Sequence, residues 1–576
     1  MRVFFLFFFG RQSDNDVLYF HNLSFDGSFI VDWLLRNKYT HVHTDAPKDM
    51  ESNTFTTSIS YMGEWYRMYI KKGRCLLEIR NSFKLIPSSL KTIGKSFATK
   101  HQKLDMEYEG ERHANCEITP EDRGYIRNDV LVLKEALEKM FDEGHSKLTI
   151  GSCCLAEFKA GYGKKDYSIF FPNLQEEWLD ERYAGAWNQD EYVRKSYHGG
   201  WCYVNPKFQG RLIEGGQVYD VNSLYPSVMS TLKYRYPVGY GTYYQGLPDT
   251  VRNGKNNYYF VRFRCRFRLK KGCFPWVHIR GNPLYLANEN LITTDVRYRG
   301  NYYRYYRDID GNVCDTRQEF TMTGVDFELF LNTYHQYDME IVDCLDFRTE
   351  VGLFDEYIEK YRTLKETSTG FLRTLAKLFS NNLYGKMGAS DDSSYKEPYL
   401  DSETGILRFR TVEEHNKDTG YIPCGSAITS YALNFTYAAA MKNRDRFCYA
   451  DTDSVHLSGL TPADNIPIDS KKYGHWKNEL TFSSAYYERQ KVYCEIATHE
   501  NGELLDTPKT VLKCAGMTRT AREQFETDGM SPQELCVGLT LPESNLKAER
   551  VRGGIVLRKK DFQLRKSVDK HVRPVL

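Results

Sequence analysis

The chain of 576 residues lacks long apolar runs, paired metal-ligand cysteines and a large excess of either charge. No apolar run reaches the roughly 18 residues of a membrane-spanning helix, and 41% hydrophobic residues with a mean hydropathy of −0.58 exclude a membrane protein. The 14 cysteines form no Cys-x-x-Cys pair, which argues against a zinc site and favours a reducing compartment such as the cytoplasm. Because the formal net charge is only +2, any surface for a polyanion must be local. The length predicts several domains, and no tandem repeat occurs.

The first chemical signal lies at residues 449–454 (YADTDS), where Asp451 and Asp453 flank Thr452 between apolar runs. If the flanks are strands, their period of two directs both carboxylates to one face and Thr452 to the other. Carboxylates that close repel each other unless a cation lies between them. Mg²⁺ prefers hard oxygen ligands and often takes one or two carboxylates plus substrate phosphates. The alternative is an exposed turn capped by its own side chains, which is common on surfaces.

A second acidic segment, residues 219–227 (YDVNSLYPS), places Asp220 at the end of an apolar run. A small polar turn follows, then Tyr225 and a proline that prevents the strand from continuing. Taken alone, this segment fits an aspartate that caps a helix above a buried tyrosine. Asp220 and Asp451 are far apart in the sequence, so only a folded domain could bring them together.

A third segment, residues 372–385 (LRTLAKLFSNNLYG), predicts a cationic helix face. Arg373, Lys377 and Asn381 recur every four residues, so a helix places them on one side and Leu375 and Leu378 on the other. A cationic face of this kind suits the phosphates of a nucleoside triphosphate. The three segments together indicate metal-dependent phosphoryl transfer on nucleic acid.

In their order along the chain, these segments resemble motifs A, B and C of family B DNA polymerases. The resemblance implies an α/β multidomain fold, with an incomplete ribonuclease H-like 3′–5′ exonuclease domain and a right-hand polymerase of palm, fingers and thumb. It implies that Asp220 and Asp453, with Val221, hold two Mg²⁺ or Mn²⁺ ions per polymerase site, and that Asp451 is a catalytic carboxylate beside them. The implied nucleotide-binding residues are Val221, Ser223, Leu224, Tyr225, Lys365, Arg373, Lys377, Asn381 and Tyr384. Among them, Tyr225 is the expected steric gate, whose ring fills the space of a ribose 2′-hydroxyl.

More narrowly, the chain resembles the protein-primed replicases of small podophages, which start synthesis on a terminal protein. Residues 197–200 (YHGG) resemble the link between exonuclease and polymerase modules, and residues 491–493 (KVY) resemble the motif that holds the primer end. The implied DNA contacts are Tyr197, Gly199, Gly200, Thr429, Lys491 and Tyr493. The implied partners are primer-template DNA, dNTPs and a terminal protein, for a monomer that acts in the cytoplasm of a host cell. The source would be a virus, phage or mobile element.

The intervals between the motifs leave room for the two insertions of this subfamily. The predicted segments are an exonuclease-like domain at 1–160, palm at 161–230 and 422–515, a first insertion at 231–350, fingers at 351–388, a second insertion with a hairpin at 389–421, and thumb at 516–576. Two positions depart from the family. Asn382 replaces the usual serine of motif B, and Leu433 stands where relatives carry an arginine that grips the template. The second departure predicts a lower affinity for the template.

Residues 261–271 (VRFRCRFRLKK) predict a strand with arginines on one face, because the arginines alternate strictly with apolar residues. The row consists of Arg262, Arg264, Arg266 and Arg268. A solvated strand face normally carries both signs of charge, so we favour a row that faces phosphates over a solvated face. The row lies inside the first insertion, where the resemblance implies contacts with DNA or terminal protein.

The N-terminal part matches the exonuclease motifs of the family incompletely. Residues 19–29 (YFHNLSFDGSF) resemble the second motif and residues 125–129 (YIRND) the third. The implied exonuclease residues are Asn22, Phe25, Asp26, Ser82, Phe83, Lys103, Tyr125 and Asp129, with Asp26 and Asp129 as metal ligands. Of these, Ser82, Phe83 and Lys103 fall where the family keeps single-strand-binding and catalytic residues. The first motif, Asp-x-Glu on a leading strand, is absent before Tyr19, so the start is interpreted as truncated or divergent. We therefore expect proofreading to be weak or absent, with half of a two-metal site remaining.

Other functions stay open at this point. The incomplete N-terminal part suggests a catalytically inactive remnant that binds DNA or terminal protein, although the carboxylates of Asp220, Asp451 and Asp453 all survive. An RNA-primed family B polymerase is disfavoured by the insertion between motifs B and C. A reverse transcriptase would more typically carry adjacent aspartates in motif C.

Overall fold

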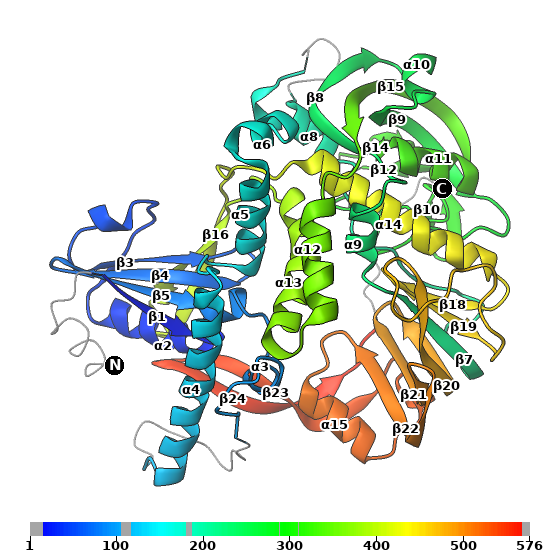
Figure 1. Ribbon diagram of the computed structural model, residues 1–576. Helices are drawn as coiled ribbons and strands as arrows, with labels where there is room; N and C mark the ends of the chain where they lie inside the picture. Colours follow the sequence, from blue (N-terminus) through cyan, green and yellow to red (C-terminus); the bar gives the residue numbers. More distant parts are fainter. Residues whose placement is uncertain (1–14, 105–116, 180–186, 287, 309, 567–576) are drawn as a thin grey trace.

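The computed structural model describes residues 15–104, 117–179, 187–286, 288–308 and 310–566. Figure 1 shows an N-terminal sheet on one side, the largest sheet on the other, and a pair of helices between them. A further sheet lies above the large one. The predicted α/β multidomain fold is confirmed. No helix within the described ranges is long and apolar enough to cross a membrane.

The N-terminal module is a five-stranded sheet in the order β1-β5-β4-β3-β2, with β1 parallel to β5 and β2 parallel to β3. Its elements are β1 (Asn15–Phe20), α2 (Leu23–Arg36), β2 (Thr40–His41), β3 (Thr54–Ile59), β4 (Trp65–Lys72), β5 (Cys75–Asn81), α3 (Leu90–Ser96) and α4 (Pro120–Asp142). One face of α2 packs on the sheet through Ile30, Val31 and Leu34. A capping box of Thr119 and Asp122 starts α4, because each side chain satisfies a free backbone N–H of the first turn.

The largest sheet has the strand order β22-β21-β20-β7-β19-β18-β6. Its strands are β6 (Cys202–Val204), β7 (Leu212–Val221), β18 (Phe447–Asp451), β19 (Ser454–Ser458), β20 (Trp476–Arg489), β21 (Val492–Glu500) and β22 (Glu503–Cys514). The short helix α9 (Leu224–Met229) follows β7, and the buried helix α14 (Ile422–Lys442) precedes β18. Because β7 lies between β19 and β20, the sheet unites segments that are far apart in the sequence. The predicted motifs A and C therefore meet at one end of this sheet.

The central helices α12 (Asp355–Thr367) and α13 (Gly370–Met387) form an antiparallel pair. Gly370 adopts a left-handed φ of 56° at the start of α13, where a side chain would be strained. The helix α13 also packs against α5 (Ile150–Tyr162), which α6 (Lys164–Phe170) and α8 (Gln189–Arg194) follow. The predicted boundary at residue 160 falls inside α5, which is one continuous helix.

The first predicted insertion contains an antiparallel sheet in the order β14-β9-β15-β8. Its strands are β8 (Tyr236–Gln245), β9 (Asn257–Leu269), β14 (Gln318–Thr323) and β15 (Tyr334–Glu350), with helices α10 (Asp249–Arg252) and α11 (Gly324–Thr333). Two small hairpins also occur here, made of β10 (Val296–Tyr298), β11 (Asn301–Tyr303), β12 (Tyr305–Arg307) and β13 (Val313–Asp315). The strand predicted from the alternating arginines is thus confirmed as β9, with a neighbour on each side.

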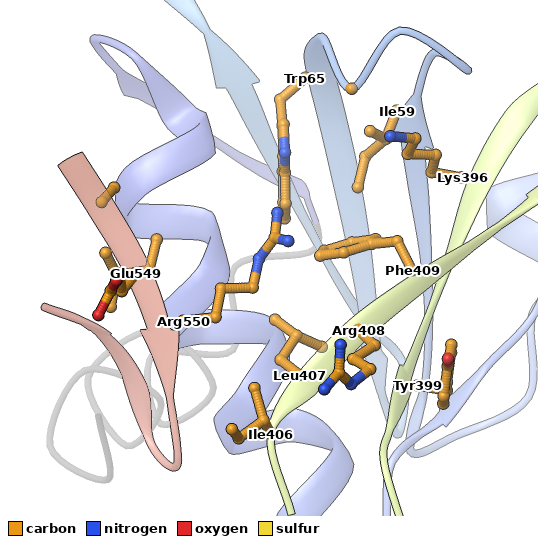
Figure 2. A pocket seen from close by; sticks show the side chains of 13 residues that line it. Ile59, Trp65, Lys396, Tyr399, Ile406, Leu407, Arg408, Phe409, Glu549 and Arg550 are labelled. Atoms are coloured by element: carbon orange, nitrogen blue, oxygen red, sulfur yellow. The ribbon is translucent and has the colours of Figure 1, made fainter. Parts of the chain in front are cut away.

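Two hairpins from distant parts of the chain come together beside the N-terminal sheet. They are β16 (Tyr395–Leu400) with β17 (Leu407–Val412), and β23 (Thr540–Val551) with β24 (Gly554–Gln563), the latter after α15 (Arg519–Thr527). A cavity of about 660 Å³ lies where these hairpins meet β4 (Figure 2). Arg550 points from β23 toward Trp65 and Phe409, with its guanidinium carbon 4.7 Å from the Phe409 ring centre. The contact joins the C-terminal hairpin to β17, and β24 also packs against α2 of the N-terminal module.

Candidate functional site

The turn between β18 and β19 carries Asp451 as the last strand residue and Asp453 outside both strands. Thr452 adopts a left-handed φ of 61°, and its N–H donates to the carbonyl oxygen of Trp201 at 2.7 Å. The strand period that was expected to direct both carboxylates to one face ends at Asp451, so the turn and not the period places Asp453. The turn instead aims the two carboxylates at different partners.

Asp453 lies beside Asp220, although the two are distant in the sequence. Ser454 is in register with Asp220 across β19 and β7, and the N–H of Val221 donates to the carbonyl oxygen of Asp453 at 2.8 Å. Burial raises the pKa of Asp453 to about 7, and the nearby Asp220 contributes to the rise. Burial and Glu479 also raise the pKa of Asp220. Lys477 opposes the rise at Asp220, so within the described residues only Asp220 of the two half-buried carboxylates has a lysine beside it.

Each side of this site has one lysine. Lys477 of β20 places Nζ 3.3 Å from Asp220 Oδ1, and Lys491 of the β20–β21 turn places Nζ 2.8 Å from Asp451 Oδ2. The family motif predicted Lys491, but nothing in the sequence singled out Lys477 or the neighbouring Glu479. Their positions follow from the register of β20 with β7, which the amino-acid pattern does not specify.

The donors at this site suit a hard divalent cation. Asp220 and Asp453 offer carboxylate oxygens, and the raised pKa of Asp453 reflects its burial and, after that, repulsion from Asp220 that a cation would offset. Within the residues that the structure describes, no group of three or more His, Cys, Asp or Glu side chains could hold a metal by itself. Two carboxylates nevertheless suffice for Mg²⁺ when substrate phosphates complete its ligands.

The predicted nucleotide-binding residues converge on the space between α9 and α13. The Tyr225 ring stacks on the Tyr384 ring with centres 4.1 Å apart and planes inclined by 18°. Lys365 of α12 donates from Nζ to the Ser223 hydroxyl at 3.3 Å. Leu224, which starts α9, is buried and fixes the turn from below.

The cationic face of α13 is present as predicted. Arg373, Lys377 and Asn381 are exposed on one side of the helix, while Leu375 is buried on the other. Arg373 donates from Nη1 to the carbonyl oxygen of Lys365 at 2.8 Å, which joins α12 to α13. Burial lowers the pKa of Lys365, and Arg373, Lys377 and Lys477 lower it further. Such mutually repelling cations favour the arrival of an anion between them.

Residues 197–200 and 491–493 border the turn at residues 451–453, called the aspartate turn below. A Cβ atom at Gly200 would collide with Thr452, so the link can approach the turn only as glycine. The N–H of Lys491 donates to the Tyr449 hydroxyl at 3.1 Å. The Tyr493 ring is buried beneath the turn, 5.0 Å from the Tyr449 ring, and so offers no open face to a base. Lys491 remains the exposed cation of that motif, whereas Tyr197 is half-buried and Gly199 is exposed.

The prediction that Thr429 contacts DNA is wrong. Its side chain is buried in α14, and its hydroxyl donates to the carbonyl oxygens of Gly425 and Ser426 in the same helix. Leu433, one turn later, is also buried in the core. The helix α14 is buried on nearly all sides, so the chain's own packing occupies these positions.

The prediction that a row of arginines faces phosphates is wrong for Arg262. Each of the other three arginines of the row has at least one acidic partner. Arg262 is buried and bonds the fully buried carboxylate of Asp343 on β15. The remaining arginines pair as Arg264 with Glu319, Arg266 with Asp338, Asp295 and Asp315, and Arg268 with Asp295. The face is therefore mixed in sign across neighbouring strands.

The exonuclease-like residues lie on α2, α4 and the loops between them. Lys103 donates from Nζ to Asp129 Oδ2 at 2.7 Å and to the Tyr125 hydroxyl at 2.6 Å. Burial raises the pKa of Asp26 on α2. Asn22 precedes α2 in the left-handed region, with φ of 66°.

Phe25 of the second motif is exposed. At the positions where the family keeps single-strand-binding residues, Phe83 is exposed but Ser82 is fully buried. The Ser82 hydroxyl donates to the carbonyl oxygen of Phe20 at 3.0 Å. The prediction that Ser82 contacts a strand is therefore wrong. The first motif was expected before Tyr19; of that stretch residues 1–14 lie outside the described residues, and residues 15–18 belong to β1.

Comparison with known proteins agrees with this geometry. The family model for DNA polymerase type B, organellar and viral, matches residues 10–471. The DNA polymerase of Bacillus phage B103 is 36% identical over 558 residues, covering 94% of this chain and 89% of the relative. The DNA polymerase of Streptococcus phage Cp-1 is 31% identical over 559 residues, covering 96% and 88%. Phi29 DNA polymerase in complex with primer-template DNA and incoming nucleotides superposes with a TM-score of 0.82 at 34% identity, covering 98% of this chain and 93% of that one. The chain therefore belongs to the type B DNA polymerases, among the relatives of the phi29 phage enzyme, and is a DNA-directed DNA polymerase.

Proposed function

We propose that this chain is a replicative polymerase that extends DNA by nucleotidyl transfer at a two-metal site built on Asp220 and Asp453. The observation that carries the proposal is the adjacency of these carboxylates, with the pKa of Asp453 raised to about 7 by burial and by Asp220. Mg²⁺ or Mn²⁺ ions bound there would supply charge neutralisation and a lowered pKa for the attacking 3′-hydroxyl. Val221, at the strand end between them, is the proposed further ligand.

The remaining residues of the site would bind and orient the incoming nucleotide. Lys365, Arg373 and Lys377 attract the triphosphate and stabilise the charge that develops as pyrophosphate leaves the α-phosphorus. The stacked rings of Tyr225 and Tyr384 occupy the sugar side of the pocket, where a ribose 2′-hydroxyl would need space. Asn381 lies on the same exposed face of α13 as the cations.

The primer end is the proposed partner of Lys491, whose ammonium also pairs with Asp451. Through this pair, Asp451 positions the lysine next to the reacting hydroxyl. Residues 197–200 would guide the DNA backbone past the turn, because exposed glycines permit close approach.

Initiation on a terminal protein is the proposed start of synthesis. Support comes from the similarity to phage enzymes over 94% of the chain and from the presence of both insertion hairpin regions. In that step a protein hydroxyl would replace the 3′-hydroxyl as the attacking group. Incubation with the terminal protein of the same genome and a labelled dNTP should yield a labelled protein. We place these steps in the host cytoplasm, since these relatives are phage proteins.

Exonuclease activity of this chain is proposed to be weak or absent. Lys103 forms an ion pair with Asp129, and within the described parts of the chain neither Asp26 nor Asp129 belongs to a group of three or more His, Cys, Asp or Glu side chains that could hold a metal. Two-metal hydrolysis needs a more complete acidic cage than these residues provide.

A gel assay tests the proposal. A labelled primer-template is incubated with the full chain and Mg²⁺, with and without dNTPs. Extension with dNTPs and an intact primer without them is the expected result. Binding without extension would instead favour a catalytically inactive DNA-binding protein, and degradation without dNTPs would contradict the loss of exonuclease activity.

A further inference from the structure

Lys477 occupies a position at the polymerase carboxylates that the family motifs do not assign. It is in register with Asp220 across β20 and β7, so the sheet fixes where its side chain begins. Its Nζ lies 3.3 Å from Asp220 Oδ1 and 3.9 Å from Glu479 Oε1, and 26% of the side chain is exposed. The ammonium is thus a built part of the site and reaches the carboxylate that would hold a metal.

The charge of Lys477 also extends to the nucleotide side. It lowers the pKa of Lys365 together with Arg373 and Lys377, after the larger effect of burial. Lys365 in turn bonds Ser223 of the turn that follows Asp220. The charge of Lys477 therefore acts both on Asp220 and on a lysine proposed to attract the triphosphate.

We infer that Lys477 is a tethered counter-ion of the metal site, which holds Asp220 until a divalent ion displaces it and so sets the metal concentration at which the site fills. The inference rests on the proposed metal site at Asp220 and Asp453. A divalent cation on Asp220 would stand within a few ångströms of the ammonium, where like charges repel. The flexible four-carbon stem allows Lys477 to move, and Glu479 is the nearest alternative carboxylate.

The second lysine of the site behaves differently. Lys491 pairs with Asp451, which lies beside the proposed metal ligands, and 59% of its side chain is exposed. A metal on Asp220 and Asp453 does not require Lys491 to leave its carboxylate. The displacement is therefore specific to Lys477, and the two lysines have separate roles.

The first test measures Mn²⁺ binding to the full chain without nucleotide or DNA, from the loss of the free Mn²⁺ electron paramagnetic resonance signal. Lys477→Met, which keeps the length of the side chain and removes its charge, should bind Mn²⁺ about fivefold to tenfold more tightly than the parent. Lys477→Arg should bind no more tightly than the parent. The matched control is Lys509→Met on β22, which removes a lysine paired with Glu500 in the same sheet and should leave binding unchanged.

Unchanged or weaker Mn²⁺ binding in folded Lys477→Met would overturn the inference. Asp220→Asn separates this failure from failure of the proposed metal site. If Asp220→Asn weakens binding and Lys477→Met has no effect, only the counter-ion role is wrong. If Asp220→Asn has no effect either, the metal does not bind there and both proposals fall.

A second measurement distinguishes an effect of Lys477 on metal binding from a general effect of the substitution on the fold. The Mg²⁺ concentration for half-maximal primer extension should fall about fivefold in Lys477→Met, in step with the Mn²⁺ affinity. A variant that only disturbed the fold would lower the maximal rate without shifting the Mg²⁺ midpoint, and that result would overturn the inference. Far-ultraviolet circular dichroism and thermal unfolding of each variant establish that the fold is retained.

Discussion

Asp220, near the end of β7, lies beside Asp453, in the turn before β19, and the Val221 N–H donates to the carbonyl oxygen of Asp453 at 2.8 Å. Because the backbone fixes where both side chains begin, the two carboxylates remain neighbours despite their repulsion. Asp453→Asn keeps the shape of the side chain and removes a metal ligand. Extension should fall at least about a thousandfold, since metal charge stabilisation is worth several kcal/mol.

Binding of primer-template by Asp453→Asn, measured by fluorescence anisotropy without metal, should match the parent because no proposed DNA contact changes. The control is Asp464→Asn, at an aspartate near the surface that is not a member of the site. Extension by Asp453→Asn at more than a few per cent of the parent rate would contradict the assigned role.

The pKa of Asp453, raised to about 7 by burial and Asp220, predicts how stability depends on pH without metal. An acid whose pKa is higher in the folded state binds its proton more tightly there. The folded state therefore loses stability as pH rises from about 4, where the unfolded carboxyl ionises, to about 7. Asp453→Asn should remove this loss and raise the metal-free Tm at pH 8 by a few degrees.

Differential scanning calorimetry in EDTA at pH 5 and pH 8 measures the effect. At pH 5 the parent and Asp453→Asn should differ less, because the parent carboxyl is then mostly protonated. Equal Tm differences at both pH values would show that Asp453 does not titrate in this window. Added Mg²⁺ should raise the Tm of the parent at pH 8 more than that of the variant.

Local patterns in the sequence predicted the elements of the site. The helix face of Arg373 and Lys377 follows from a spacing of four, and strand β9 follows from strict alternation with apolar residues. Each pattern lies within a single helix or strand, so it can be recognised without knowing how that element packs against others. The aspartate turn was located for the same reason.

Contacts between elements were not predictable. The partner of Arg262 is Asp343 on β15, and the partner of Asp220 is Lys477 on β20, and both depend on strand order and register. The prediction that Thr429 contacts DNA was wrong for a related reason. The rest of the fold covers α14 on nearly all sides, and the sequence of α14 has no polar face that would indicate which side meets solvent. Family motifs transfer positions along the chain, but burial is decided by the rest of the fold.

The stacked pair Tyr225 and Tyr384 predicts a test of sugar selection. Tyr225→Val opens the space beside the sugar and should lower discrimination against ribonucleotides by about a hundredfold or more, because the clash with the 2′-hydroxyl is removed. Single-nucleotide incorporation kinetics with dCTP and CTP measure the ratio of kcat/KM. Tyr225→Phe retains the ring and is the matched control, with discrimination close to the parent. Unchanged discrimination in Tyr225→Val would reject Tyr225 as the gate.

Arg262 now predicts a stability effect in place of a DNA contact. Asp343 is fully buried and also accepts bonds from the Tyr192 and Tyr243 hydroxyls. Arg262→Met leaves that carboxylate without its cation and should cost on the order of 3–5 kcal/mol of unfolding free energy. Arg264→Met, at an exposed pair with Glu319, should cost less than about 1 kcal/mol.

Chemical denaturation measures the unfolding free energy of Arg262→Met and Arg264→Met. The salt dependence of DNA binding tests separately whether the arginine row contacts phosphates. The slope of log K against log salt should be the same in Arg264→Met and the parent. A phosphate contact would reduce that slope by about one unit. Such a reduction would restore the row as a DNA-binding surface.

The Lys103 and Asp129 pair leads to a prediction for the exonuclease-like module. Lys103 pairs with Asp129, and the described residues hold no cluster of three carboxylate, histidine or cysteine side chains that could hold a metal, so Asp26→Asn should leave the low rate of single-strand degradation unchanged. A 5′-labelled oligonucleotide incubated with Mg²⁺ and no dNTPs gives the rate, and Asp453→Asn serves as a control for degradation by the polymerase site. A variant that adds a strand with Asp-x-Glu ahead of β1 should gain activity, since it would complete the acidic cage that two-metal hydrolysis requires. If the parent already degrades single strands and Asp26→Asn abolishes this, the module is a working exonuclease and the proposed loss of proofreading is wrong.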